Sequence, residues 1–114
     1  MSRASAGSRV PPRVVAPLFA ALGDETRLQL LLQLCRKGPG SIAELSAGAA
    51  VSRQAVTKHL KVLADAGYAE GERVGREHVW RLRPERLDDA RHWLERVSRE
   101  WDEALGRLKN FVED

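Results

Sequence analysis

Apolar residues recur at helical spacing through the first third of the chain. A first amphipathic segment covers residues 14–22 and ends at Gly23. Asp24 is placed to cap a second helix, which extends to residue 37 and stops before a Gly-Pro pair. The second helix is apolar on more than one side, which predicts a central place in the core for Leu28, Leu30, Leu31, Leu32, Leu34 and Cys35.

Two further helices are predicted between residues 41 and 66. The stretch SIAE at 41–44 has the capping-box pattern, in which a serine and a glutamate each bond the other's backbone N–H, and it starts a short helix. Small residues at 47–51 form a tight link. A fourth helix then covers residues 52–66 and ends at Gly67.

The pattern changes to that of β-structure over residues 68–82. Branched and aromatic residues flank a Gly75-Arg76 turn, which predicts a hairpin with a basic tip. Pro84 ends the second strand and is suited to the first turn of a last helix.

The last helix, about residues 86–112, has the most regular pattern in the chain. Its apolar residues alternate in steps of three and four, as in the heptad seam of a coiled coil. A helix of about 25 residues is ~37 Å long, which exceeds the body on which it packs. We therefore expect part of its apolar face to pair with a partner chain, through Leu94, Val97, Trp101, Leu105 and Leu108.

The length and composition of the chain predict the number of domains and the cellular compartment. The chain has 114 residues, which suits one domain over residues 13–114 behind a flexible basic arm at residues 1–12. The single cysteine cannot form an internal disulfide, and no apolar run is long enough to span a bilayer. These features predict a cytoplasmic protein with no membrane partner. The net charge of +3 permits an anionic partner without requiring one.

The fourth helix places its polar side chains on one stripe. At 100° per residue, Gln54, Thr57, Lys58 and Lys61 lie opposite the wedge formed by Val56, Leu60 and Leu63. Amide, hydroxyl and ammonium groups are those that bond base edges and phosphates of DNA, and Ser52 and Arg53 extend the set at the N-terminus of the helix.

An ordinary solvated helix face is the alternative reading of this stripe. The short helix, tight link and following helix have helix-turn-helix spacing, which favours DNA binding in the major groove. Arg73 and Arg76 in the hairpin are predicted to contact the minor groove or its phosphates. Arg81 is not included, because Glu70, Glu72 and Glu77 dilute the charge of the hairpin and a charge that protects a sheet edge from pairing is a serious alternative for Arg81.

Three stretches carry a family resemblance: LFAALGDETRLQLLLQL, SIAELSAGAAVSRQAVTKHLKVLADAGY and GREHVWRL. Over roughly residues 14–110 the chain resembles the ArsR-type winged-helix regulators of bacterial transcription. The resemblance implies a mainly α fold with a β-hairpin wing at residues 70–82, and a homodimer formed by the terminal helices. It also implies repression from an inverted-repeat operator, with Ser52, Gln54, Thr57 and Lys58 at bases or nearby phosphates.

Many members of that family sense metals, but this chain lacks the usual ligands. The segment at 41–47 has no cysteine or histidine, and the last helix has His92 alone among carboxylates, whereas soft or borderline ions need about four N or S ligands. We therefore expect no metal and no cofactor. His59 is predicted to be a packed histidine bonded by backbone or hairpin, His78 a strand residue at the surface, and Cys35 a buried, inert thiol, with a redox switch as its alternative.

Two other classes of function compete with a DNA-binding repressor. A protein-interaction module would use the basic face for an acidic protein and the heptad helix for pairing, without specific DNA binding. An enzyme is not expected, because no nucleophile–base pair or phosphate loop is visible in the sequence.

Overall fold

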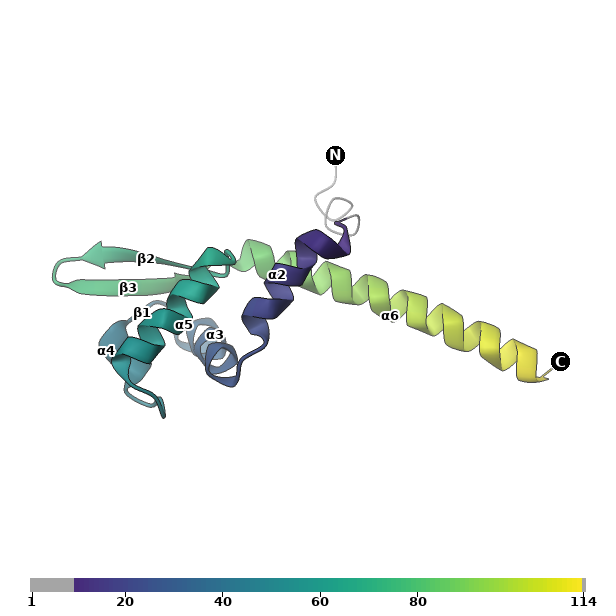
Figure 1. Cartoon of the computed structure of the whole chain (residues 1–114), viewed down its shortest axis with the longest axis horizontal. Helices are drawn as coiled ribbons and strands as arrows, with labels where there is room; N and C mark the ends of the chain where they lie inside the picture. Colours follow the sequence, from purple (N-terminus) through teal and green to yellow (C-terminus); the bar gives the residue numbers. More distant parts are fainter. Residues whose placement is uncertain (1–9, 114) are drawn as a thin grey trace.

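The computed structural model describes residues 10–113, in which helices form a small body with a wing on one side and a long helix on the other (Figure 1). In chain order the elements are α2 (Pro12–Leu22), α3 (Glu25–Lys37), β1 (Gly40–Ser41), α4 (Ile42–Ser46), α5 (Arg53–Asp65), β2 (Ala69–Val74), β3 (Glu77–Leu82) and α6 (Pro84–Glu113). The mainly helical fold with a hairpin wing is thus confirmed.

The ends of the helices follow the predicted capping chemistry. Asp24 caps α3 by accepting from the backbone N–H of Arg27, and the Ser41–Glu44 capping box before α4 is complete. Helix α6 begins at Pro84, the proline suited to its first turn, two residues before the predicted start near residue 86. Helix α2 begins at Pro12, one residue before the predicted domain start, and residues 1–9 of the predicted arm lie outside the described residues.

The core lies where α2, α3 and α5 meet the base of the wing. Its most buried side chains include Val15 of α2 and the three members of the predicted wedge of α5, Val56, Leu60 and Leu63. The prediction for α3 was only partly right. Leu30, Leu31 and Leu34 are buried, but Leu28 and Leu32 are 50% and 48% exposed because they lie on a face of α3 that no other described element covers.

The wing is an antiparallel hairpin in which Gly71 pairs with Trp80 and Arg73 with His78. Gly75 has a φ of +62° and is the only positive-φ residue of the Gly75-Arg76 turn, as in a type II′ hairpin. The two-residue strand β1, which was not predicted, pairs with β3 and makes a three-stranded sheet of order β1-β3-β2.

Tyr68 joins the wing to α2 and is the only tyrosine in the chain. Its side chain is fully buried, and its hydroxyl donates a hydrogen bond of 2.8 Å to the carbonyl of Leu18. Burial, helped by the negative charge of Asp89, raises the pKa of Tyr68 to about 12.

This burial predicts an alkaline titration that is specific to the folded state. Tyrosinate absorbance at 295 nm should stay low at about pH 11 in the folded protein and rise near the ordinary value of about 10 in denaturant. Because the folded pKa is raised, the contribution of Tyr68 to stability is complete below about pH 10 and is lost as the pH rises toward 12. A midpoint near 10 in the folded protein would contradict this burial.

Candidate nucleic-acid interface

Helix α5 presents the predicted stripe to solvent. Gln54, Lys58 and Lys61 are exposed, on the side opposite the buried wedge. Thr57 is half-buried, and its hydroxyl donates to the carbonyl of Arg53 at 2.9 Å, so that its methyl group remains the part free for contact. The stripe is therefore an amide and two ammonium groups with a threonine methyl between them.

Ser52 is the N-cap of α5 rather than its first residue. Its Oγ accepts from the backbone N–H of Ala55 at 3.2 Å, and both Ser52 and Arg53 are exposed. Arg53 therefore lies in the first turn of α5, where free backbone N–H groups and the positive end of the helix dipole suit an anion such as phosphate.

Helix α4 packs against α5, as the first helix of a helix-turn-helix does. In its capping box, Oε1 of Glu44 accepts from the backbone N–H of Ser41 at 2.9 Å, and the Ser41 hydroxyl accepts from the Glu44 backbone at 3.2 Å. The backbone N–H of Ser41 in particular holds the pKa of Glu44 below its usual value. Buried Leu45 anchors this short helix to the core.

The arginines of the wing fall into two groups. Oε1 of Glu70 accepts from Nε of Arg81 at 2.6 Å, and Oε2 accepts from Arg83 at 3.1 Å. The bond from Arg81 is the main reason why the pKa of Glu70 lies below its usual value. Arg73 and Arg76, near the tip, are exposed and form no ion pair within residues 10–113. The guanidinium groups near the tip are therefore free to contact an external group, although Glu72 and Glu77 flank them, and Arg81 belongs to the base of the wing.

His78 lies on the surface of the wing, as predicted, and stacks on Trp80. Their ring centroids are 4.7 Å apart, with an angle of 27° between the planes. The stacked rings leave no room for a side chain at Gly71 across the hairpin, where an added Cβ would lie 2.6 Å from Nε2 of His78. The pair therefore stiffens the wing below its basic tip.

His59 has different partners from those predicted. Its Nδ1 lies 3.2 Å from Nη1 of Arg27 and 3.7 Å from Oδ2 of Asp24, both at the start of α3. It is half-buried and packed, as expected, but it is bonded by neither the hairpin nor the backbone, because its ring faces the corner between α2 and α3. No local sequence signal could have identified Arg27, which is 32 residues away.

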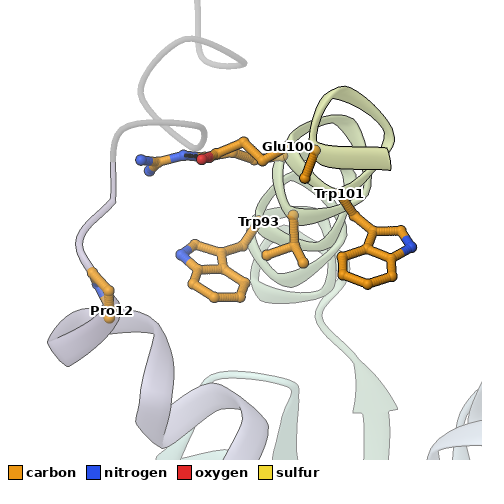
Figure 2. Close-up of a pocket in the computed structure, with 7 residues that line it drawn as sticks. Pro12, Trp93, Glu100 and Trp101 are labelled. Atoms are coloured by element: carbon orange, nitrogen blue, oxygen red, sulfur yellow. Dashed lines mark hydrogen bonds and ion pairs between the residues drawn. The ribbon is translucent and has the colours of Figure 1, made fainter. Parts of the chain in front are cut away.

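The apolar face of α6 is largely uncovered. The predicted interface residues are all exposed, and Trp101 is 63% exposed: Leu94, Val97, Trp101, Leu105 and Leu108. Trp93 and Trp101 flank a hollow of about 410 Å³, in which Trp93 points toward Pro12 of α2 and Trp101 points away from it (Figure 2). An ion pair of 3.1 Å between Arg96 and Glu100 borders this hollow.

A second uncovered apolar surface was not predicted. Leu22 at the end of α2 borders one hollow with Leu94 of α6 and another with Leu28 and Leu32 of α3. The surface thus continues from the long helix to the outer face of α3.

Cys35 is exposed, which contradicts the prediction of a buried thiol. It lies seven residues after Leu28 on the same uncovered face of α3. Within the described part of the chain, no three His, Cys, Asp or Glu side chains gather as a possible metal site. None of the helices in residues 10–113 is long and apolar enough to cross a bilayer.

Comparisons with known proteins agree with this geometry. A family described as "Helix-turn-helix domain" matches residues 22–68. The chain is 38% identical over 95 residues to the "HTH-type transcriptional regulator Rv2034" of Mycobacterium tuberculosis. The aligned region covers 83% of this chain and 85% of that protein. It is 36% identical over 78 residues to a "Probable mercury resistance operon repressor" of Streptomyces lividans. That aligned region covers 68% of this chain and 62% of the relative.

A solved structure with the same architecture supports the assignment. The "ArsR-like Transcriptional Regulator from Rhodococcus sp. RHA1" superimposes with a TM-score of 0.73 and 38% identity, over 87% of this chain and 92% of that one. The relatives are transcriptional regulators and not enzymes. The chain therefore belongs to the ArsR family of winged helix-turn-helix, DNA-binding transcriptional regulators.

Proposed function

We propose that the protein is a homodimeric repressor that binds an inverted-repeat operator in the bacterial cytoplasm. Its recognition helix, residues 52–66, enters the major groove, and its wing, residues 70–82, reaches the adjacent minor groove. The observation that carries this proposal is the exposed stripe of α5, whose amide and ammonium groups have no acidic partner among residues 10–113.

Different members of the surface take different roles. Gln54, in the first turn of α5, reads a base edge, because an amide bonds both N6 and N7 of adenine. Thr57 offers its methyl group to a thymine, and Lys58 bonds a guanine or a phosphate. Phosphate contacts are made by Ser52, Arg53, Lys61, Arg73 and Arg76.

The dimer follows from the uncovered face of α6. Two copies related by a two-fold axis bury Leu94, Val97, Trp101, Leu105 and Leu108 against each other, which removes an apolar stripe from water. A two-fold dimer presents two α5 helices in opposite directions, and an inverted repeat has the same symmetry. We propose that no metal takes part in this assembly.

Gel shifts with the DNA upstream of the protein's own gene test the proposal. Specific binding should be salt-sensitive and should survive an excess of random DNA that removes non-specific binding. If random DNA competes as well as the specific fragment at every salt concentration, the proposal fails. Release of the fragment by added Zn²⁺ would contradict the absence of a metal response.

Two alanine variants on the exposed face of α5 should distinguish recognition of bases from electrostatic attraction to phosphates. Gln54→Ala should cost about 1–3 kcal/mol with the operator and little with random DNA, because it removes base bonds. Lys61→Ala should weaken binding to all sequences and reduce the salt slope by about one per half-site, because it removes a phosphate contact. Similar losses for both variants on all DNA would show that Gln54 reads no base.

A further inference from the structure

Arg27 connects the end of α2 to the start of α3. It is the third residue of α3, and its guanidinium turns back toward the C-terminus of α2. There Nε donates to the carbonyl of Ala21 at 2.6 Å, and Nη2 lies 3.5 Å from the carbonyl of Ala20. Carbonyls in the last turn of a helix lack donors within the helix, so Arg27 caps α2 from outside.

The same guanidinium also reaches α5. Nη1 of Arg27 lies 3.2 Å from Nδ1 of His59, whose side chain is 23% exposed. Arginine can only donate, so Nδ1 is the acceptor and the neutral ring carries its proton on Nε2. Asp24 completes the cluster, because its Oδ2 accepts from the backbone N–H of Arg27 at 3.0 Å and caps α3. Three helices therefore meet at one guanidinium.

We propose that Arg27 is a positioning residue for DNA recognition, which fixes the rotation of α5 through His59; this inference rests on the proposed function. The other anchors of α5 are apolar: Val56, Leu60 and Leu63. Dispersion contacts hold the helix against the core but have little directional preference, whereas a hydrogen bond weakens steeply when its angle changes.

The consequence lies on the opposite side of α5. His59 directly follows Lys58, so a rotation of the helix that broke the Arg27 bond would move the whole stripe. Bidentate contacts to base edges depend on orientation, whereas a lysine at a phosphate acts as a point charge with a flexible stem. Loss of the Arg27–His59 bond should therefore reduce discrimination between sequences and spare general affinity for DNA.

Three variants test this role. None of them changes the net charge of the protein when the imidazole of His59 is neutral. Arg27→Lys keeps the positive charge but loses the planar fork that bridges α2 and α5. His59→Leu removes the acceptor at Nδ1. His59→Asn is the matched control, because the amide oxygen of asparagine takes the place of Nδ1 and restores an acceptor.

We expect Arg27→Lys and His59→Leu each to weaken operator binding by about tenfold, the factor given by loss of one hydrogen bond to a charged group. Affinity for random DNA and the salt slope should stay within about twofold of the wild type, because no phosphate contact is lost. His59→Asn should bind the operator within about threefold of the wild type, and the double variant Arg27→Lys/His59→Leu should be no weaker than either single one.

Fluorescence anisotropy with labelled operator and labelled random duplex at two salt concentrations gives these values, with circular dichroism to confirm folding. Operator binding like that of the wild type in both single variants would overturn the role of Arg27, as would equal losses on operator and random DNA. If Arg27→Lys does not fold, the His59 pair decides, since equal affinities of the leucine and asparagine variants would overturn the proposal. A wild-type protein that does not distinguish operator from random DNA would instead refute the proposed function.

Discussion

Trp101→Asp is expected to convert the proposed dimer into monomers and to weaken operator binding by about 10²–10⁴-fold. Trp101 lies in the middle of the uncovered apolar face of α6, and a two-fold axis would place two carboxylates in an apolar interface. A monomer binds one half-site and loses the gain from engaging both halves at once, which is of this size for linked binding modules. Sedimentation equilibrium and anisotropy with the operator measure the two effects.

Asn110→Asp is the matched control for this variant. It adds the same negative charge to the same helix, nine residues later and therefore on the opposite side of α6 from Trp101. It should stay dimeric and bind the operator nearly as well as the wild type. If Trp101→Asp stays dimeric at low concentration, the interface lies elsewhere, for example on the apolar surface of Leu22, Leu28 and Leu32. If it is monomeric and still binds the operator fully, dimerisation does not contribute to DNA affinity.

Features that depend on neighbouring residues were predictable from the sequence. The caps of α3 and α4, the turn at Gly75 and the start of α6 at Pro84 each require one residue type at one place. The phase of α5 was equally clear, because its apolar residues fill one wedge and its amide and basic residues the opposite stripe. These local rules were sufficient to place the candidate DNA-binding surface.

Features that depend on distant residues were not predictable. Strand β1 has two residues and exists because Gly40 and Ser41 pair with Trp80 and Val79, about 40 residues away. Two residues cannot show the alternation that indicates a strand. The bond between Arg27 and His59 likewise crosses the core and has no counterpart in any local pattern.

The outer face of α3 shows another limit of prediction from the sequence. Apolar residues on several sides of a helix indicate burial, but the sequence does not say whether the same chain or another chain covers them. Leu28, Leu32 and Cys35 were assigned to the core for this reason, yet they lie exposed on one face. For α6, the length of the helix indicated that it extends past the body, and its apolar face is indeed exposed; the pairing of that face with a partner chain stays a prediction.

Leu60→Ala is expected to destabilise the protein by about 2–5 kcal/mol, the usual cost of truncating a buried leucine. Leu60 is fully buried between α5 and the rest of the core, so the lost methyl groups leave a cavity that the surrounding helices only partly fill. Urea unfolding at one fixed protein concentration measures the loss, because the stability of a dimer depends on concentration. Val62→Ala is the control on the same helix: Val62 is 39% exposed, and its truncation should cost less than about 1 kcal/mol.

This variant also tests how recognition depends on packing. Leu60 lies beside His59, but it carries no polar group, and the proposed positioning of α5 depends on the Arg27 bond. At a temperature where Leu60→Ala is fully folded, we therefore expect its ratio of operator to random-DNA affinity to stay within about threefold of the wild type, less than the tenfold change that follows the loss of one bond to a charged group. A loss of specificity as large as that of His59→Leu would show that apolar packing alone sets the orientation of α5. If Leu60→Ala keeps its preference for the operator although its core is destabilised, then different contacts of α5 determine stability and DNA recognition.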